Sequence, residues 1–249
     1  MCIRDSTAAK ELGLKVCNSN YAPNGVADYT VMLMLLSLRK YKPALWRAQV
    51  NDYSLAGLQG RELRNLTVGI LGTGKIGAAV IKNLSGFGCR ILASDIRENP
   101  SLKGLCTYVD NETLYKACDI ISLHMPLLES TRHFVNAETI AKMKDGVTII
   151  NCARGELMNI PDMIRGIETQ KIGALALDVF DKEDGIYHEN RRDDIISNRD
   201  MAYLRQFPNV IMTQHMAFYT DAAVQSMVFC GIEGLCDFAK TGHTETELV

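Results

Sequence analysis

The sequence lacks the features that mark several large classes of protein. Its 27 Lys and Arg against 29 Asp and Glu give a formal net charge of −2, so no bulk charge attracts nucleic acid or an anionic membrane. The longest apolar run, residues 31–36, is too short to cross a bilayer, and no secretory signal is recognised. Neither an internal repeat nor a low-complexity tract is present. We therefore expect a globular chain, with neither nucleic acid nor membrane as a partner, long enough for one large domain or two modest ones.

Cysteine is present without the spacing that marks a disulfide framework or a zinc site. The eight cysteines are scattered, none closer together than Cys230 and Cys236, and there is no C-x-x-C pair. Cys89, Cys118 and Cys152 lie in or beside apolar runs, where a reduced thiol behaves as a small hydrophobic group. The sequence thus predicts no metal site and a reducing, cytoplasmic location.

The strongest positive signal lies in residues 67–95. An apolar run, Thr67–Leu71, predicts a strand buried on both faces. A G-x-G-x-x-G pattern follows at residues 72–77, then apolar residues at helical spacing, a second strand at Arg90–Ser94, and Asp95. Strand, glycines, helix, strand and acid in this order predict a dinucleotide-binding unit, whereas the glycine pattern alone would be weak.

Each part of this unit has a mechanical reason. Gly72 allows the tight turn, Gly74 lets the backbone approach a pyrophosphate, and Gly77 lets helix and strand pack closely. Amide groups at the start of the helix are expected to hold the anion. Asp95 suits the ribose hydroxyls and repels a 2′-phosphate, which favours NAD over NADP, although Arg97 lies close enough to weaken that argument. The turn residues expected to bind the cofactor are Gly72, Thr73, Gly74, Lys75, Ile76 and Gly77.

The rest of the chain continues an alternation of strands and helices. Further strands are predicted at residues 107–109, 120–123, 147–151, 174–178 and 210–213, and helices at 111–118, 136–143 and 160–169. This alternation predicts an α/β fold with a doubly wound parallel sheet of the Rossmann type.

The outer segments are expected to be less regular. The chain opens with the end of a helix and a strand at 14–18, and a long helix at 26–42 stops at Pro43. Residues 182–204 form a polar insertion with a short helix. A helix at 221–240, with Val224, Val228, Ile232, Leu235 and Ala239 on one stripe, is followed by a frayed end at 241–249.

Polar and titratable side chains follow the predicted strands. In an open parallel sheet the ligand binds beyond the carboxyl ends of the strands. The strand-end residues expected to line the cofactor, besides the glycine-rich turn and Asp95, are His124, Met125, Pro126, Asn151, Cys152 and Asp178.

Three charged or titratable residues at this edge fit a reaction. Arg154 presents a planar fork of donors that suits a substrate carboxylate, and Gly155 is expected to free the turn that aims it. Glu183, bonded to one ring nitrogen of His215, would hold the ring and leave the other nitrogen as a proton donor. With a hydride from a nicotinamide cofactor, this set suits the reduction of a 2-keto acid. Taken singly, each residue also has an ordinary structural explanation as an exposed charge or a strand-end histidine.

Five segments in order resemble the D-isomer-specific 2-hydroxyacid dehydrogenases. They read GTGKIG, ISLHMPL, INCARGEL, ALALDVFDKE and FPNVIMTQHMAFYTDAAV. Within that family, the segments YAPNGVADYTVMLMLL and HMAFYT and the polar insertion resemble most the D-lactate dehydrogenases, including the vancomycin-resistance type.

The resemblance implies an NAD cofactor, a homodimer formed through the cofactor domain, and the catalytic set Arg154, Glu183 and His215. It also implies that Asp178 lies near the nicotinamide and that Tyr21 and Phe218 contact the substrate. Gln214, where the family usually has proline, and Met216, where a small or hydroxyl residue is common, depart from the pattern on either side of His215.

The resemblance further implies three parts. Residues 1–20 would be the remnant of a flavodoxin-like substrate domain, of which 1–6 fit nothing that follows and are expected to be non-native. Residues 21–217 would be the NAD-binding domain, and 218–249 a helix returning to the substrate domain. We expect a chain that is N-terminally truncated, binds NAD(H) and turns over poorly.

The resulting prediction is an NAD-dependent D-2-hydroxyacid dehydrogenase, with pyruvate and D-lactate as the first substrate pair. Three alternatives stay open: a reductase of a bulkier 2-keto acid, a phosphoglycerate dehydrogenase, and a non-catalytic NAD-sensing protein like the corepressors of this fold. The Arg–Glu–His set weighs against the last.

Overall fold

The structure is a computed structural model that describes residues 6–249. The segment expected to be non-native lies outside the described residues except for Ser6, where α1 begins. The chain divides into two compact units, a larger one, Val26–Ala217, and a smaller one made of Met1–Gly25 and Phe218–Val249. The predicted assignment of these parts to a cofactor domain and a substrate domain stays a prediction.

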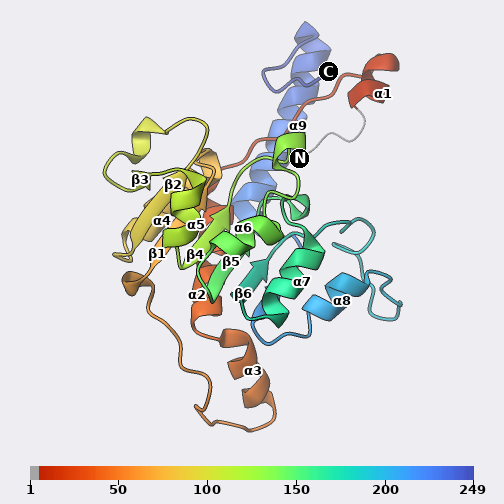
Figure 1. The fold of residues 1–249 in the computed structure, drawn as a ribbon. Coiled ribbons are helices and arrows are strands. Elements are labelled where there is room, and N and C mark those ends of the chain that lie inside the picture. The colour runs from red at the N-terminus through yellow and green to blue at the C-terminus, as the bar shows by residue number, and fades with distance from the viewer. Residues whose placement is uncertain (1–5) are drawn as a thin grey trace. The chain divides into compact units, whose positions relative to one another are not determined.

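The larger unit is built on one seven-stranded sheet with the order β3-β2-β1-β4-β5-β6-β7 (Figure 1). Every pairing is parallel. The strands are β1 (Thr67–Leu71), β2 (Arg90–Ser94), β3 (Thr107–Tyr108), β4 (Ile120–Leu123), β5 (Val147–Asn151), β6 (Ile172–Leu177) and β7 (Val210–Met212).

The strand order confirms the predicted fold class. Chain order reverses at β1, so β2 and β3 lie on one side and β4 to β7 on the other. Such a reversal opens a crevice at the carboxyl ends of β1 and β4, where open α/β sheets bind their ligands. The central strands β4 and β5 are buried along their whole length, as expected for strands covered on both faces.

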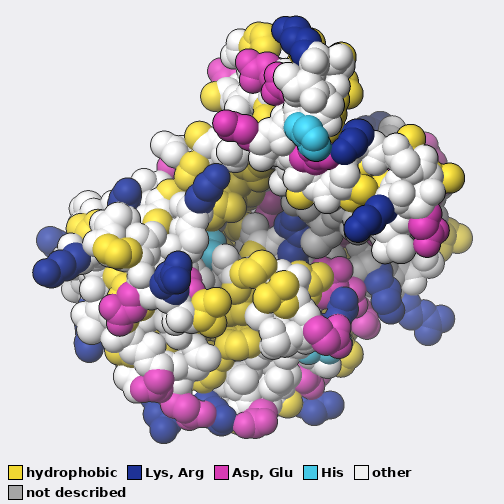
Figure 2. Space-filling model, turned by 90° about the horizontal axis from the view of Figure 1, so that it is seen from above, with side chains coloured by type: hydrophobic (Ala, Val, Ile, Leu, Met, Phe, Trp, Pro, Cys, Tyr) yellow, Lys and Arg dark blue, Asp and Glu magenta, His cyan; other side chains and the backbone are white. Residues whose placement is uncertain are grey.

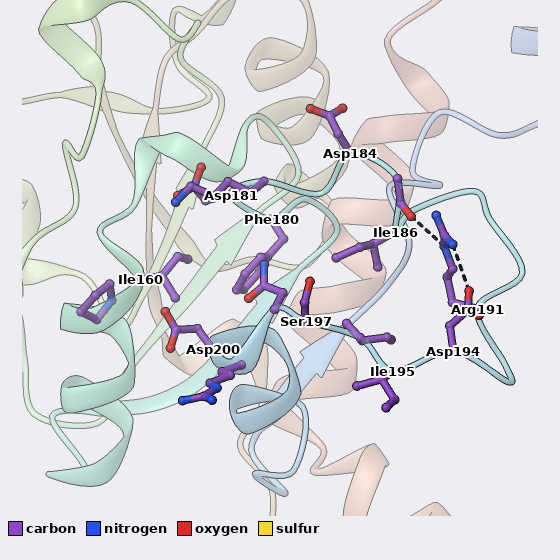
Figure 3. A pocket seen from close by; sticks show the side chains of 16 residues that line it. Ile160, Phe180, Asp181, Asp184, Ile186, Arg191, Asp194, Ile195, Ser197 and Asp200 are labelled. Carbon is purple, nitrogen blue, oxygen red and sulfur yellow. Dashed lines mark hydrogen bonds and ion pairs between the residues drawn. The ribbon is translucent and has the colours of Figure 1, made fainter.

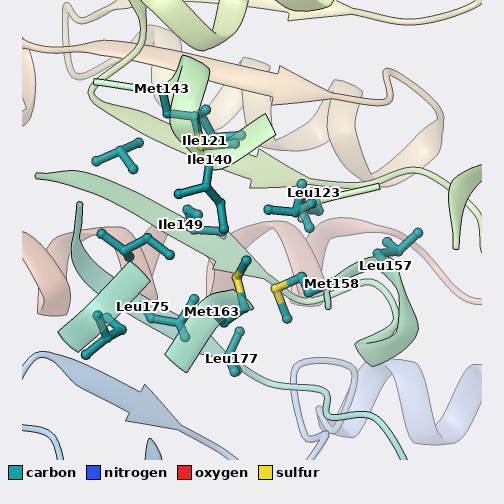
Figure 4. Close-up of a cluster of buried hydrophobic side chains, with 14 of the residues drawn as sticks. Ile121, Leu123, Ile140, Met143, Ile149, Leu157, Met158, Met163, Leu175 and Leu177 are labelled. Carbon is teal, nitrogen blue, oxygen red and sulfur yellow. The ribbon is translucent and has the colours of Figure 1, made fainter. Parts of the chain in front are cut away.

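Helices cover both faces of this sheet (Figure 1). Those of the larger unit are α2 (Asn24–Leu38), α3 (Tyr41–Gln49), α4 (Lys75–Ser85), α5 (Asn111–Ala117), α6 (Ala137–Lys142), α7 (Ile160–Glu168) and α8 (Arg199–Leu204). On one face, α5, α6 and α7 pack their apolar side chains on Ile121, Ile149 and Leu175 of the central strands (Figure 4). On the other, α2 and α4 are joined by a 2.7 Å hydrogen bond from Asn83 to Asp28.

The helix predicted at 26–42 is wrong at its C-terminal end. α2 ends at Leu38, Lys40 takes a left-handed φ of 49°, and α3 begins at Tyr41. Pro43 therefore lies in the first turn of α3 instead of after a helix, a position where proline is tolerated because the first amides have no helical partner. Lys42, in the first turn of α3, donates to the carbonyl oxygens of Arg205, Phe207 and Val210 at 2.7 Å each.

The smaller unit contains α1 (Ser6–Glu11), the segment at 14–20 and α9 (Asp221–Thr241). The predicted strand at 14–18 is reduced to one antiparallel bridge between Cys17 and Glu247. That bridge, and the 2.6 Å ion pair from Lys15 to Glu247, show that the prediction of a frayed C-terminal end was also wrong.

The predicted apolar stripe of α9 is exposed. Val228, Ile232 and Leu235 are 55%, 53% and 67% exposed, while a side chain at Gly234 would collide with the thiol of Cys17. α9 therefore packs within the smaller unit on a different face from the predicted one. α9 is also long and apolar enough to cross a membrane. This is weak evidence for a membrane span, because core helices of soluble proteins meet the same criterion of length and hydropathy.

Charges of both signs are interspersed on the face drawn in Figure 2. This distribution matches the nearly balanced composition, 27 basic against 29 acidic residues.

Candidate functional site

The glycine-rich turn between β1 and α4 is shaped by close backbone contacts. Gly72 has a φ of 95°, and a Cβ there would lie 2.8 Å from the backbone of His124 and Met125. A Cβ at Gly77 would overlap the carbonyl oxygen of Gly72. A Cβ at Gly74 would meet no protein atom within 4 Å, so protein packing does not require glycine there. That open position is where a pyrophosphate could approach the backbone.

Some amide groups of this turn donate to other parts of the protein, and others lie at the start of α4. Gly72 donates its amide to Ser94 O at 2.9 Å, and Thr73 donates its amide to Asp95 Oδ2 at 2.5 Å. Ala78 donates to Gly74 O at 2.9 Å and begins the helical ladder. The amides of residues 75–77, which include the predicted Lys75 and Ile76, are the ones at the helix start where anions bind. The Thr73 amide bonds to Asp95, and the predicted contact of Thr73 with the cofactor stays a prediction.

Asp95 lies at the end of β2, as predicted, with its carboxylate held from two sides. Its Oδ2 accepts the amide and, at 3.0 Å, the hydroxyl of Thr73, and its Oδ1 accepts the Arg97 amide at 3.2 Å. Partial burial alone would raise the pKa of Asp95, but the hydrogen bonds from Thr73 and Arg97 outweigh it and lower that pKa. The group is therefore a carboxylate at neutral pH, able to accept hydroxyl donors.

His124 follows β4 and lies against the glycine-rich turn. Its amide donates to Leu71 O at 2.7 Å, and its ring nitrogen Nε2 lies 2.9 Å from Ser122 Oγ. Burial lowers the pKa of His124 to about 4, because a charged ring is poorly solvated there. The ring is neutral at physiological pH, and its predicted place along the cofactor, like that of Met125 and Pro126, stays a prediction.

Asn151 and Cys152, at the end of β5, build the turn that carries Arg154. Asn151 is fully buried; its Oδ1 accepts the Ala153 amide at 2.9 Å and its Nδ2 donates to Arg154 O at 2.8 Å. Burial raises the pKa of the Cys152 thiol to about 12, so it is a neutral side chain. The role of Asn151 that the structure shows is to fix this turn.

Arg154 projects from this turn, with Nη1 donating to Ala153 O at 2.6 Å. The reason predicted for Gly155 was wrong, because its φ lies outside the left-handed region. A Cβ at Gly155 would overlap the backbone of Phe180 and Asp181. Glycine is needed here so that the Arg154 turn can lie against the loop that follows β6.

Glu183 and His215 form the pair that the sequence predicted. Glu183 Oε1 lies 2.5 Å from His215 Nδ1, and Glu183 Oε2 accepts the Phe180 amide at 2.9 Å. The side chains are 23% and 27% exposed. Because a carboxylate can only accept, His215 Nδ1 carries a hydrogen and the ring is held with Nε2 directed elsewhere.

Asp178 fixes the loop that carries His215. Its Oδ1 accepts from Thr213 Oγ1 at 2.6 Å and the Met216 amide at 3.0 Å, its Oδ2 accepts the Ala217 amide at 2.8 Å, and its carbonyl accepts the His215 amide. His215 itself has a φ of 54°, a left-handed conformation that needs such support. Asp178 is fully buried, so the structure gives it a positioning role; its predicted contact with the cofactor stays a prediction.

Three neighbouring strands therefore bring the predicted catalytic residues to one edge. Arg154 follows β5, Glu183 follows β6 and His215 follows β7, and these strands pair in that order. The contact of Gly155 with Phe180 links the loops after β5 and β6, and the hydrogen bond between Glu183 and His215 links the loops after β6 and β7.

A cavity of about 950 Å³ lies beside this edge, and the residues that line it include Phe180, Asp184, Ile186, Arg191 and residues 194–200 (Figure 3). Arg191 donates to Gly185 O at 2.7 Å and pairs with Asp194 at 2.9 Å. None of Arg154, Glu183 and His215 lines it, so this cavity is adjacent to the candidate site and separate from it.

The predicted substrate residues Tyr21 and Phe218 belong to the smaller unit. Their rings lie 6.5 Å apart between centroids, at 48°. Their contact with a substrate stays a prediction. Among residues 6–249, no group of three or more His, Cys, Asp or Glu side chains is arranged to hold a metal ion.

The sequence reasoning missed residues that hold others in place. Thr213 supports Asp178, Tyr108 and Asn99 bond to Thr73, and His188 Nε2 donates to His215 O at 3.0 Å. No local motif marks these residues, because their partners are distant in the sequence.

Comparison with known proteins identifies the family of the chain. The family described as "D-isomer specific 2-hydroxyacid dehydrogenase, NAD binding domain" matches residues 31–217. An aromatic 2-oxoacid reductase of Clostridium sporogenes is 44% identical over 98% of this chain and 75% of its own length. A D-lactate dehydrogenase of Lactobacillus delbrueckii subsp. bulgaricus is 37% identical over 97% of this chain and 73% of its own. A solved D-lactate dehydrogenase structure from Treponema pallidum superposes with a TM-score of 0.92 at 31% identity, covering 98% of this chain and 75% of that one.

The chain belongs to the D-isomer-specific 2-hydroxyacid dehydrogenases and contains their NAD-binding domain. These are NAD-dependent oxidoreductases that act on CH–OH groups, and NAD is the cofactor.

Proposed function

We propose that this protein reduces 2-keto acids to D-2-hydroxy acids with NADH. The observation that carries the proposal is the hydrogen bond between Glu183 and His215, at the same sheet edge as Arg154. A structural histidine would not need a half-buried carboxylate partner, a neighbouring guanidinium and a left-handed backbone together.

Each residue has a distinct role in the proposed reaction. Arg154 binds the substrate carboxylate and polarises the keto group through its planar donors. His215 gives a proton from Nε2 to the keto oxygen, and Glu183 orients the ring and stabilises its charged form before the transfer. In the reverse direction His215 takes the proton from the hydroxyl group.

The cofactor fits the glycine-rich turn. When bound, NADH supplies the hydride that the keto carbon receives. The amides of residues 75–77 would hold its pyrophosphate, open backbone at Gly74 would let it approach, and Asp95 would accept the adenine ribose hydroxyls.

For the substrate, we propose pyruvate first, because the sequence segments most resemble the D-lactate dehydrogenases. An aromatic 2-oxo acid is the second candidate, since the Clostridium sporogenes relative with 44% identity is named for aromatic 2-oxo acids. A tyrosine and a phenylalanine, Tyr21 and Phe218, lie together in the smaller unit and would suit an aromatic side chain.

Steady-state oxidation of NADH with pyruvate, phenylpyruvate and 3-phosphohydroxypyruvate tests the proposal. A kcat/KM at least tenfold higher for pyruvate supports the first candidate, and the reverse ratio supports the second. A preference for 3-phosphohydroxypyruvate would support the phosphoglycerate alternative. NADH binding without oxidation by any 2-keto acid contradicts the enzyme proposal and favours the NAD-sensing alternative.

We further propose a cytoplasmic homodimer formed through the larger unit. In α3 and the segment after it, Trp46, Tyr53 and Leu55 are 47%, 75% and 83% exposed, an apolar surface of the kind that partners cover. Sedimentation of the variant with Tyr53→Ser and Leu55→Ser should give a monomer where the parent gives a dimer; an unchanged dimer would contradict this interface.

A further inference from the structure

A chain of hydrogen bonds that no sequence motif predicts runs from β3 to the carboxylate of Asp95. The Asn99 amide donates to Tyr108 Oη at 2.8 Å, Tyr108 Oη donates to Thr73 Oγ1 at 2.9 Å, and Thr73 Oγ1 donates to Asp95 Oδ2 at 3.0 Å. Asn99 Nδ2 also donates to Thr73 O at 3.1 Å. These four residues connect the end of β2, the glycine-rich turn and β3.

The direction of the chain is fixed by its two ends. An amide can only donate and a carboxylate can only accept. Each hydroxyl between them has one hydrogen, so Tyr108 must give its hydrogen to Thr73, and Thr73 must give its own to Asp95. Thr73 is only 3% exposed, so water is poorly placed to replace the hydroxyl of Tyr108.

We infer that Tyr108 is a positioning residue for recognition of the adenine ribose. Its hydroxyl holds the Thr73 hydroxyl toward Asp95, which keeps the carboxylate in one orientation at the end of β2. A carboxylate fixed there accepts the ribose hydroxyls and repels a 2′-phosphate. Tyr108 thus strengthens the preference for NADH over NADPH without touching the cofactor itself. The inference rests on the proposed contact of Asp95 with the ribose.

The Tyr108→Phe variant removes the chain's middle hydroxyl and keeps the ring. Losing one supporting hydrogen bond should weaken NADH binding by about 3- to 10-fold. The binding of NADPH, which gains nothing from a carboxylate fixed in this orientation, should weaken less than that of NADH. The expected result is a fall of about 3-fold or more in the ratio of the NADPH Kd to the NADH Kd, measured by nicotinamide fluorescence titration of the full chain.

Tyr203→Phe is the matched control, because Tyr203 donates to Glu168 at 2.8 Å on the surface and should leave both Kd values unchanged. Thr73→Val interrupts the same chain at the next position and should lower the ratio in the same direction. It keeps the experiment decisive should Tyr108→Phe fold poorly. Equal weakening of both cofactors by these two variants, or no change in the ratio, overturns the positioning role.

Asp95→Asn separates this inference from the proposal beneath it. If Asp95→Asn lowers the ratio and Tyr108→Phe does not, Asp95 binds the ribose and the role of Tyr108 is wrong. If Asp95→Asn also leaves the ratio unchanged, the proposed ribose contact itself fails.

Discussion

At the β1–β2 half of the sheet the candidate site consists of backbone amides and one carboxylate, whereas at the β5–β7 half it consists of three side chains from separate loops. The first half is shaped by absent side chains: Gly72 and Gly77 allow backbone segments to touch. The second half is held by a buried carboxylate, Asp178, that gathers the loop carrying His215. This difference explains why the β1–β2 half can be recognised from a local sequence motif, whereas the β5–β7 half cannot.

A glycine pattern records a steric requirement over a few residues, so it can be read locally. The support of His215 depends on Asp178, which lies far from it in the sequence, and on a backbone φ of 54°. The β1–β2 half should therefore respond to changes of volume, and the β5–β7 half to changes of hydrogen-bonding groups.

The largest expected effect is that of His215→Ala. Removing the proton donor should lower kcat for 2-keto acid reduction by about 100-fold or more, with the NADH Kd unchanged. Stopped-flow and fluorescence titration measure the two quantities. His243→Ala is the control, because its side chain is 80% exposed in the smaller unit. A retained rate in His215→Ala would remove the acid–base role from the β5–β7 half.

Asp178→Asn should be the next largest effect. The amides of Met216 and Ala217 bond to different oxygens of Asp178, and an asparagine can offer its single oxygen to only one of them. The free energy of unfolding should fall by about 2–4 kcal/mol, measured by chemical denaturation. Asp145→Asn, at a surface ion pair with Lys171, should cause no measurable change. A stability equal to that of the parent would mean that the loop does not depend on this carboxylate.

Gly77→Ala and Gly74→Ala should separate packing from binding in the β1–β2 half. Alanine at Gly77 overlaps Gly72 O and should lower the free energy of unfolding by about 1–3 kcal/mol. Alanine at Gly74 meets no protein atom, so stability should change by less than about 1 kcal/mol, while the NADH Kd rises about tenfold or more if a pyrophosphate approaches there. An unchanged Kd in Gly74→Ala would contradict the placement of the pyrophosphate.

His124→Asn should change the pH dependence of stability. The pKa of His124 is about 4 in the folded state against 6.5 for an ordinary histidine. Between those values the unfolded chain binds more protons, so the parent loses stability as pH falls from 6.5 to 4. Asparagine cannot be protonated, so the variant should lose less stability than the parent over this range. The difference should be about 1–2 kcal/mol at pH 4, after allowance for the partial exposure of His124. Parallel stability–pH curves for the two proteins would show that burial of His124 does not oppose its charging.

Much of the fold could be predicted because its strands are short, apolar and well bounded. β1, β2, β4 and β5 begin and end where the sequence predicted. The break at Lys40 was missed, since a left-handed lysine has no signature and Pro43 suggested a helix end at Lys42, four residues beyond the end of α2 at Leu38. The exposed stripe of α9 was misjudged, because periodicity identifies an apolar face without showing what it packs against.

The sequence predicted the candidate catalytic residues better than it predicted the residues that hold them in place. Arg154, Glu183 and His215 lie at the expected strand ends, and the predicted Glu183–His215 contact is confirmed by the 2.5 Å distance. The need for glycine at 155 was recognised for the wrong reason, since its cause is contact with Phe180 across the sheet edge. Thr213 and Tyr108 act through partners that only the folded chain brings near.

The most direct test of the central claim is a crystal structure of the protein with NADH and oxamate, an unreactive analogue of pyruvate. The oxamate carboxylate should pair with Arg154, and the other carbonyl oxygen of oxamate should lie within hydrogen-bond distance of His215 Nε2. The nicotinamide ring should lie against the carbon that bears this oxygen. Oxamate bound away from Arg154 and His215, or a nicotinamide ring facing elsewhere, would contradict the account.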